Sequence, residues 1–298
     1  MVSNIVMEIH LHSSQSIPMS GLRQIFLAIS LIASCTAVWY SVPVSNQEKE
    51  TDIEYSRTLK EVRRYDAREA GQAVAVDQDH FYAISNSIIA KYQRESGERI
   101  ATWNADSQRP LRHLNSGIVR DGKLYCANSN FPGWPEASSI EVWDTTTMEH
   151  ISSHSLGICS EGSLTWIEPI EDGWYAVFAN YSKKVNDNPL AKSHRSTQLV
   201  RYDKSWRRTA GWVFPKSILD RFDPHSCSGG GFGPDGKLYC TGHDLGEVYQ
   251  LEFPKAGSIL QLTETVAAPI TGQGIAFDDE MLWGIDRAKR QVVAIEFK

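Results

Sequence analysis

A hairpin pattern that recurs five times is the feature of this 298-residue chain that most restricts its fold. Each copy has an alternating apolar strand, a tight turn with acidic residues or Asp-Gly, and a second strand that begins with an aromatic or aliphatic pair. A period of about 40 to 50 residues points to the blades of a propeller. The copies are QAVAVDQDHFYAIS from Gln72, SGIVRDGKLYCANS from Ser116, SLTWIEPIEDGWYAVFAN from Ser163, GGFGPDGKLYCTGH from Gly230 and QGIAFDDEMLWGID from Gln273.

Further extended segments complete each unit. A third strand is predicted in SIIAKYQ, SIEVWDT, TQLVRYD, GEVYQLE and QVVAIEF, and a fourth in segments such as ERIATWN and ILQLTET. Four antiparallel strands form one blade of a β-propeller. The last unit reaches Lys298 after three strands, so we expect the segment Tyr55 to Val62 to supply the fourth and close the ring. The prediction is an all-β chain with a single five-bladed propeller over residues 55–298.

Uneven spacing leaves a second blade count open. The third unit carries the insertion Lys183 to Arg195 and a long exit through Ile218 to Pro224. A sixth, degenerate blade in this region is the alternative.

The blade pattern resembles the secreted bacterial propeller repeats of the NHL, quinoprotein and gluconolactonase type, and SIEVWDTTT is similar to the third strand of a WD-like or quinoprotein-like blade. The resemblance covers residues 55–298 and lies in the blade pattern, without any family's active-site motif. It therefore implies a fold and no particular reaction.

The amino-terminal residues 1–35 have the layout of an extension and a secretory signal. Met19 is a candidate start; Arg23 precedes the apolar run Ile25 to Ile32, and small residues stand just before Cys35. The alternatives are a buried helix or a membrane anchor, but the run is short for a membrane span. Ile-Ala-Ser-Cys also resembles the bacterial lipobox, so Cys35 is a candidate for lipidation, with simple cleavage as the alternative. We expect export to a periplasmic or extracellular location, with 36–54 as a polar linker.

Charge argues against one class of partner. The net charge is -6, and no run of Lys or Arg is long enough to form a basic stripe. We therefore expect no nucleic-acid partner. Contact with a membrane is expected only through a lipid anchor or an uncleaved signal.

The loops predict where a site lies. In a propeller, the loop that enters each unit and the loop after its second strand share one face, and here these loops are long, whereas the turns on the opposite face are short. His113, His225 and His243 fall on the loop-rich face. They are candidates for a general base and its orienting partner in lactone hydrolysis or cyclisation, because imidazole titrates near neutrality. The alternative is that each histidine only hydrogen-bonds the loop backbone.

Other polar residues at matching positions are candidates for ligand binding. Trp134 either stacks on a sugar ring or caps the apolar edge between blades. Asp244 and Asp286 are the candidate metal ligands, because the likeness to gluconolactonase-type propellers implies a divalent cation such as calcium. The full ligand-binding set is Asn115, Asn128, Asn130, Trp134, Asn180, Ser226, Gln273 and Arg287.

The glycines and the Ser226 region exclude two functions. Phosphate cradles need a glycine loop that leads into a helix, whereas Gly229 to Gly231 begin a strand and allow inner strands to crowd around a narrow axis. Ser226 lacks a GxSxG elbow, which argues against a serine hydrolase.

The cysteines add one expected crosslink. Cys159 and Cys227 each precede an inner strand in neighbouring units, so a disulfide between them is expected in an exported protein. Cys126 and Cys240 are expected to be buried thiols.

Two functional hypotheses follow. The first is an exported, membrane-tethered propeller that binds a small polar or carbohydrate-like ligand, or a protein partner, at its loop-rich face. The second is a propeller enzyme of the lactonase or muconate-lactonising cycloisomerase type, with or without a divalent metal.

Overall fold

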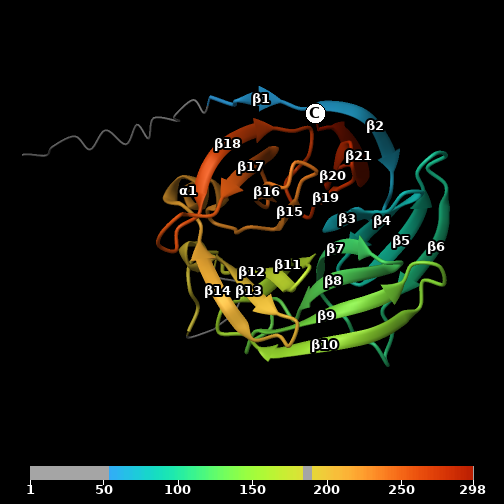
Figure 1. Cartoon of the computed structure of the whole chain (residues 1–298). Coiled ribbons are helices and arrows are strands. Elements are labelled where there is room, and N and C mark those ends of the chain that lie inside the picture. The colour runs from blue at the N-terminus through green and yellow to red at the C-terminus, as the bar shows by residue number, and fades with distance from the viewer. Residues whose placement is uncertain (1–53, 184–189, 298) are drawn as a thin grey trace, which may run out of the picture. The chain divides into compact units, whose positions relative to one another are not determined.

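The five recurring hairpins form the inner strands of five antiparallel sheets arranged in a ring (Figure 1). The computed structural model describes residues 54–183 and 190–297. The expected signal, Cys35 and the linker up to residue 53 lie outside the described residues. Within the described part of the chain, no helix is long and apolar enough to cross a membrane.

Each blade is a meander that runs from an inner to an outer strand. The first three blades are β3 (Ala73–Val76), β4 (His80–Ser85), β5 (Ile88–Gln93), β6 (Arg99–Asn104); β7 (Leu114–Arg120), β8 (Lys123–Ser129), β9 (Ala137–Asp144), β10 (His150–Ile158); and β11 (Ser163–Ile170), β12 (Gly173–Ala179), β13 (Gln198–Asp203), β14 (Arg208–Val213). The last two are β15 (Gly229–Phe232), β16 (Leu238–Thr241), β17 (Glu247–Glu252), β18 (Gln261–Ala267); and β19 (Ala276–Phe277), β20 (Met281–Asp286), β21 (Gln291–Glu296), β2 (Lys60–Asp66).

The ring is closed by the amino-terminal strand, as expected, but with a different stretch of chain. β2 pairs antiparallel with β21, while the shorter β1 (Arg57–Thr58) pairs in parallel with β18 of the fourth blade. The closing strand therefore begins at Lys60 and extends beyond the predicted Tyr55 to Val62. Tyr65 explains why the closing strand lies further along the chain. The centroid of its ring is 4.7 Å from that of Phe81 and 5.9 Å from that of Trp283, and these buried contacts set the register of the strand.

Five apolar cores alternate with the five blades, so that each core joins two neighbours. Each core contains a large buried aromatic side chain. In order around the ring these are Phe81 between the fifth and first blades, Trp143 between the first and second, Phe178 between the second and third, Phe222 between the third and fourth, and Tyr239 between the fourth and fifth. Because every blade shares a core with both neighbours, the ring is one compact unit.

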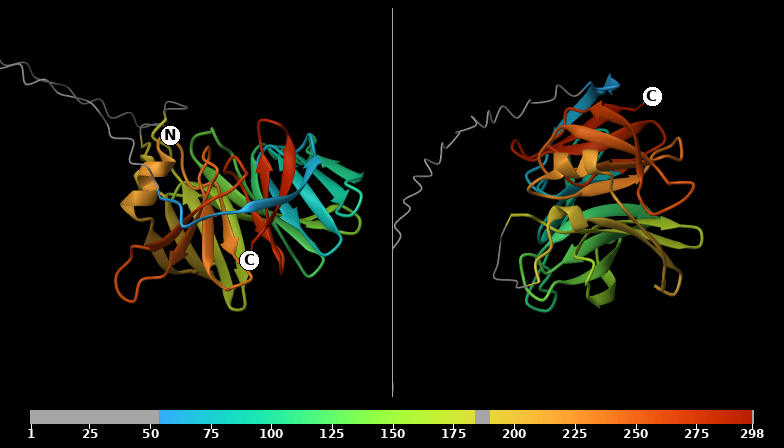
Figure 2. Two further views of the ribbon diagram at one scale, coloured as in Figure 1. Left: turned by 90° about the horizontal axis from the view of Figure 1, so that it is seen from above. Right: turned by 90° about the vertical axis from the view of Figure 1, so that its left-hand side faces the viewer.

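The alternative of a sixth blade is excluded for the described residues. The exit of the third unit forms helix α1 (Lys216–Phe222), which lies at the outside of the ring (Figure 2). Its Ile218, Leu219 and Phe222 are buried in the core between the third and fourth blades. Of the insertion, the described part holds the 3-10 turn η1 (His194–Ser196) and no strand.

Glycines allow the inner strands to meet near the axis, as the sequence predicted. A side chain at Gly229 would lie 2.3 Å from the carbonyl oxygen of Gln273, and one at Gly274 would lie 2.4 Å from Cβ of Ala73. The Gly274 N–H donates to the carbonyl of Gln72 at 2.9 Å. These close backbone contacts join the inner strands of the fourth, fifth and first blades near the axis.

Candidate functional site

The loop-rich mouth of the channel holds a pocket of about 260 Å³, here called the histidine pocket. It contains His113, His225 and His243, which are far apart in sequence and come from the second and fourth blades. All five blades contribute to its wall. The lining residues are Gln72, His113, Asn115, Phe131, Tyr181, Lys183, His225, Ser228, His243, Gln273 and Arg287.

Four side chains in and beside this pocket form a hydrogen-bonded array. Both imidazoles bind the same carboxylate: His225 Nδ1 lies 2.6 Å from Asp244 Oδ2, and His243 Nδ1 lies 2.6 Å from Asp244 Oδ1. The two rings are stacked, with centroids 4.0 Å apart. Arg287 Nη1 lies 2.9 Å from His243 Nε2. The array fixes the orientation of both rings.

The partners of His243 assign its tautomer. A guanidinium group only donates hydrogen bonds, so His243 Nε2 accepts from Arg287 and Nδ1 carries the proton that is donated to Asp244. Burial lowers the pKa of His243, and the proximity of the His225 ring and of the Arg287 guanidinium lowers it further, against the hydrogen bond to Asp244. His243 is therefore a neutral link between Arg287 and Asp244 at neutral pH.

His225 has a different arrangement. Its Nδ1 is held by Asp244, and its Nε2 has no hydrogen-bond partner among residues 54–183 and 190–297. Burial raises the pKa of Asp244, but the hydrogen bonds from His243 and His225 outweigh it and keep that pKa below its ordinary value. Asp244 is thus an ionised carboxylate that orients an imidazole with one free nitrogen.

His113 is a half-buried residue of the pocket wall. Burial lowers its pKa to about 4, and the charge of Arg287, together with that of His243 once His243 is protonated in acid, acts in the same direction. Its ring packs 5.2 Å from Phe131, which in turn packs 4.9 Å from Tyr181. At neutral pH His113 is therefore an uncharged polar group on an aromatic wall.

The structure does not assemble the expected calcium site. Ligand atoms of His225, His243 and Asp244 lie within 4.8 Å of one another, but Asp286 is outside this group. Asp286 is instead paired with Arg64 at 2.9 Å and Lys289 at 3.1 Å, and these cations satisfy its charge. Calcium prefers oxygen ligands, whereas this group offers two imidazoles and one carboxylate beside a guanidinium. The residues do not fit a calcium ion.

The remaining ligand-binding candidates divide into two groups. Asn115, Gln273 and Arg287 line the histidine pocket, whereas Asn128, Asn130 and Trp134 line a separate hollow on the second blade.

Asn180 and Ser226 line neither cavity. Asn180 Nδ2 donates to the carbonyls of Glu161 at 2.9 Å and Ser196 at 3.2 Å, and Ser226 Oγ lies 2.5 Å from Thr197 Oγ1. Both side chains are buried and connect loops, so the structure places neither of these predicted ligand-binding residues at the two cavities.

Sequence reasoning missed several residues of the pocket wall. Phe131 and Tyr181 each follow directly after a predicted candidate, Asn130 and Asn180. Successive side chains of an extended segment point in opposite directions. When the sequences of the blades are aligned with an error of one residue, the residue predicted to face the pocket is therefore the wrong one. Gln72, Lys183 and Ser228 were the other omissions; Gln72 had stood at the start of the first hairpin.

The expected disulfide between Cys159 and Cys227 is not formed, and both are buried free thiols. They lie in different cores, because Cys227 packs with the third and fourth blades and Cys159 with the second and third. Cys227 Sγ accepts a hydrogen bond from Trp166 Nε1 at 3.4 Å, and its thiol neighbour is Cys240. Cys126 and Cys240 are buried free thiols, as expected.

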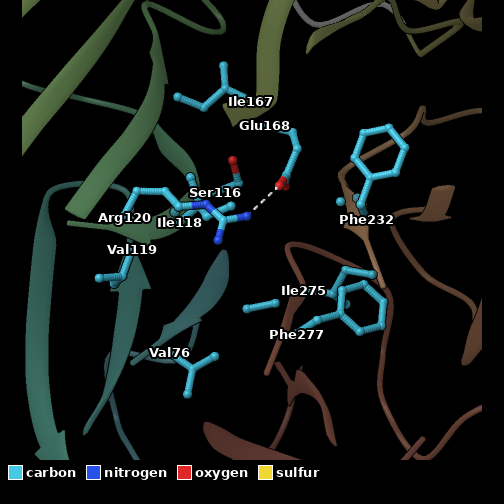
Figure 3. A pocket seen from close by; sticks show the side chains of 14 residues that line it. Val76, Ser116, Ile118, Val119, Arg120, Ile167, Glu168, Phe232, Ile275 and Phe277 are labelled. Atoms are coloured by element: carbon cyan, nitrogen blue, oxygen red, sulfur yellow. Dashed lines mark hydrogen bonds and ion pairs between the residues drawn. The ribbon is translucent and has the colours of Figure 1, made fainter. Parts of the chain in front are cut away.

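The opposite, short-turn mouth is smaller, with a cavity of about 60 Å³ (Figure 3). Arg120, at the end of β7, reaches across to Glu168 on β11, with Nη2 3.2 Å from Oε1. Burial raises the pKa of Glu168 to about 7, against the charge of Arg120 and the backbone N–H of Phe232. Ser116 Oγ lines the same cavity and has no partner among the described residues. The cavity at this mouth is lined by no histidine among the described residues, and the turns around it are short.

These features define the chain as a five-bladed β-propeller with a polar, cationic pocket at one channel mouth. Its fold is similar to that of glutaminyl cyclase from Myxococcus xanthus, with a TM-score of 0.54 and 11% identity over 82% of this chain and 98% of that chain. Two more distant structures share the fold. A luciferin-regenerating enzyme has a TM-score of 0.46 and 11% identity over 78% of this chain and 94% of that chain. Virginiamycin B lyase from Staphylococcus aureus has a TM-score of 0.44 and 10% identity over 79% of this chain and 99% of that chain.

No protein-family model and no curated protein sequence matches the chain. At these identities the structural likeness shows the propeller fold alone.

Proposed function

We propose that the histidine pocket binds a small polar molecule that carries an anionic group. The observation that supports this most is charge: the described lining contains Arg287 and Lys183 but no carboxylate, and His113 is neutral. A pocket with cationic walls and an uncharged floor favours an anion. Its volume of about 260 Å³ suits a molecule smaller than the drug-sized ligands of typical pockets.

The polar groups of the wall specify how such a molecule is held. Arg287 uses one nitrogen on His243, and the rest of its guanidinium remains for a carboxylate or a similar anion. Gln72 donates through Nε2 to Asn86, and Gln273 through Nε2 to the carbonyl of His243, so the Oε1 atoms of both amides remain as acceptors. The ligand therefore needs an anionic end and hydroxyl or N–H donors.

A second candidate function is catalysis at the same place, and the pairing of His225 with Asp244 favours it. With Nδ1–H held at 2.6 Å by the carboxylate, His225 Nε2 is available as a general base. In lactone hydrolysis it would take a proton from the attacking water, and in a cyclisation from the attacking group of the substrate. Asp244 would stabilise the imidazolium, and Arg287 would stabilise developing negative charge.

The binding function is tested by titration of the full chain with small mono- and dicarboxylates in a calorimeter. We expect Arg287→Met to weaken binding about 10- to 150-fold, the loss of a charge-assisted hydrogen bond worth ~1.5–3 kcal/mol. Arg207→Met is the matched control, because Arg207 is exposed and remote from the pocket lining. Equal affinity of the wild type and Arg287→Met would contradict the binding role.

The catalytic alternative is separated from simple binding by His225→Gln. As a base, His225 would contribute about 10²- to 10⁴-fold to turnover of a lactone or a cyclising substrate. Loss of turnover with retained affinity supports catalysis, whereas retained affinity with no turnover in either protein leaves the binding function alone.

We also propose that residues 19–35 export the propeller and that Cys35 is lipidated. The basis is the sequence layout of Arg23, the apolar run and the lipobox-like end. Fractionation of cells expressing the wild type and Cys35→Ser tests this, with lipid labelling as the direct measurement. A labelled Cys35→Ser variant, or an unlabelled wild type, would contradict lipidation.

A further inference from the structure

A second cavity on the loop-rich side of the second blade, here called the tryptophan hollow, has a volume of about 390 Å³. It shares no lining residue with the histidine pocket, but the two cavities are neighbours. Arg112 and Asn130 line the tryptophan hollow, whereas the next residues in the chain, His113 and Phe131, line the histidine pocket. The lining residues are Pro110, Arg112, Asn128, Ser129, Asn130, Gly133, Trp134, Ala137, Ser138, Ser139 and Ser155.

Trp134 provides an aromatic platform at this hollow. Its side chain is 46% exposed, which is unusual for the largest apolar residue. The loop that carries it is held in place by Asn130: its Nδ2 donates to the carbonyl of Pro135 at 2.8 Å, and its Oδ1 accepts from the N–H of Ala137 at 2.9 Å. The exposed indole is thus supported by a hydrogen-bonded frame and presents a face to a ligand.

The floor contains an unsatisfied acceptor. Asn128 Nδ2 donates to Ser139 Oγ at 3.0 Å, and Ser139 Oγ donates to Glu141 Oε1 at 2.5 Å, so the orientation of the amide is set by this chain. Asn128 Oδ1 is buried and has no partner among the described residues. Buried polar atoms are almost always paired, so this oxygen indicates a donor that arrives with a ligand.

The walls provide hydroxyl groups and one guanidinium. Ser129 and Ser155 can donate or accept, while Arg112 is exposed and no carboxylate lines the hollow. An aromatic face, an amide acceptor and several hydroxyls match a sugar ring, which has an apolar face and equatorial hydroxyls. The guanidinium adds a place for a carboxylate.

We propose that the tryptophan hollow binds a sugar residue that carries a carboxylate, a hexuronate. The ring stacks on Trp134, a ring hydroxyl donates to Asn128 Oδ1, and the carboxylate pairs with Arg112. This assignment is independent of the function proposed for the histidine pocket.

The test is calorimetric titration of the full chain with oligogalacturonate and oligomannuronate, and with oligogalactose and oligomannose as their neutral counterparts. We expect uronate binding that weakens about tenfold or more in Trp134→Ala and is largely retained in Trp134→Phe. Arg112→Met should reduce uronate affinity to that of the neutral sugars. Arg109→Met is the matched control, because Arg109 lies in the same loop but pairs with Asp106.

Three results would overturn the proposal. The first is a wild type that binds none of the four oligosaccharides while its thermal unfolding stays cooperative. The second is an affinity that Trp134→Ala leaves unchanged, and the third is binding of neutral sugars as tight as that of uronates. The variants His225→Gln and Arg287→Met should keep sugar binding. Loss of sugar binding in both variants would assign the sugar to the histidine pocket and refute a separate site. If the histidine pocket binds no carboxylate, the proposal for the tryptophan hollow is unaffected.

Discussion

Glu168 at the short-turn mouth should make the stability of the propeller depend on pH in a way that Glu168→Gln removes. Its side chain is 5% exposed, and burial raises its pKa from the ordinary 4.5 to about 7 despite the nearby Arg120. Glutamine keeps the shape and an acceptor for Arg120 and Phe232 but carries no charge. The variant therefore isolates the cost of burying one carboxylate.

The sign follows from the raised pKa. The folded state binds the proton of Glu168 more tightly than the unfolded chain does, so its contribution to stability is fully present below pH 4.5 and is lost as the pH rises through about 7. A pKa difference between 4.5 and about 7, at 1.36 kcal/mol per unit, corresponds to about 3 kcal/mol. Glu168→Gln should thus match the wild type in acid and exceed its stability by about 3 kcal/mol in mild alkali.

Urea unfolding of both proteins at a series of pH values measures this difference. Because every other titrating group is common to the two proteins, the difference between their unfolding free energies reports Glu168 alone. Arg120→Met provides a second comparison, since removal of the cation should raise the pKa of Glu168 further and move the loss of stability to higher pH. A difference that is flat across the pH series, or that favours the wild type as pH rises, would refute the reasoning.

Two other predictions concern His113 and Tyr65. Because the pKa of His113 is lowered to about 4, the contribution of its neutral form to the stability of the folded protein is present above pH 6.5 and is lost as the pH falls through 4. In urea unfolding, the wild type should therefore lose up to about 3 kcal/mol of stability in acid relative to His113→Gln. A pH-independent difference would contradict this. Tyr65→Ala should cost about 3–5 kcal/mol in thermal or urea unfolding, because it empties the core that the closing strand shares with Phe81 and Trp283. An effect within ~0.5 kcal/mol, as for an ordinary surface position, would show that the closing strand is not stabilised through Tyr65.

The blade architecture was predictable because its signals are local. Alternation of apolar residues and tight turns such as Gly233 to Gly236 depend on neighbours within one hairpin, and five such hairpins leave few ways to bury their faces. The face on which the histidine pocket lies followed from loop lengths alone. The same logic placed His113, His225 and His243 at one mouth, where the structure brings them together.

Local signals failed where a side chain is directed by contacts between blades. Asn180 and Ser226 stand at positions equivalent to pocket residues, yet their hydrogen bonds to Glu161, Ser196 and Thr197 direct them to other loops. The closing strand moved toward the carboxyl end because Tyr65 packs against Phe81 of the first blade and against Trp283 of its own, fifth blade.

The sequence by itself determined a ring of four-stranded blades and the side of the ring on which polar loops gather, because both depend on periodicity and length within short segments. Only the tertiary structure decided which polar groups meet: the shared carboxylate of Asp244, the guanidinium of Arg287 on His243, and the separation of Cys159 from Cys227. Such contacts join residues from different hairpins, and their geometry is set by how neighbouring blades pack around the axis, which no local pattern records.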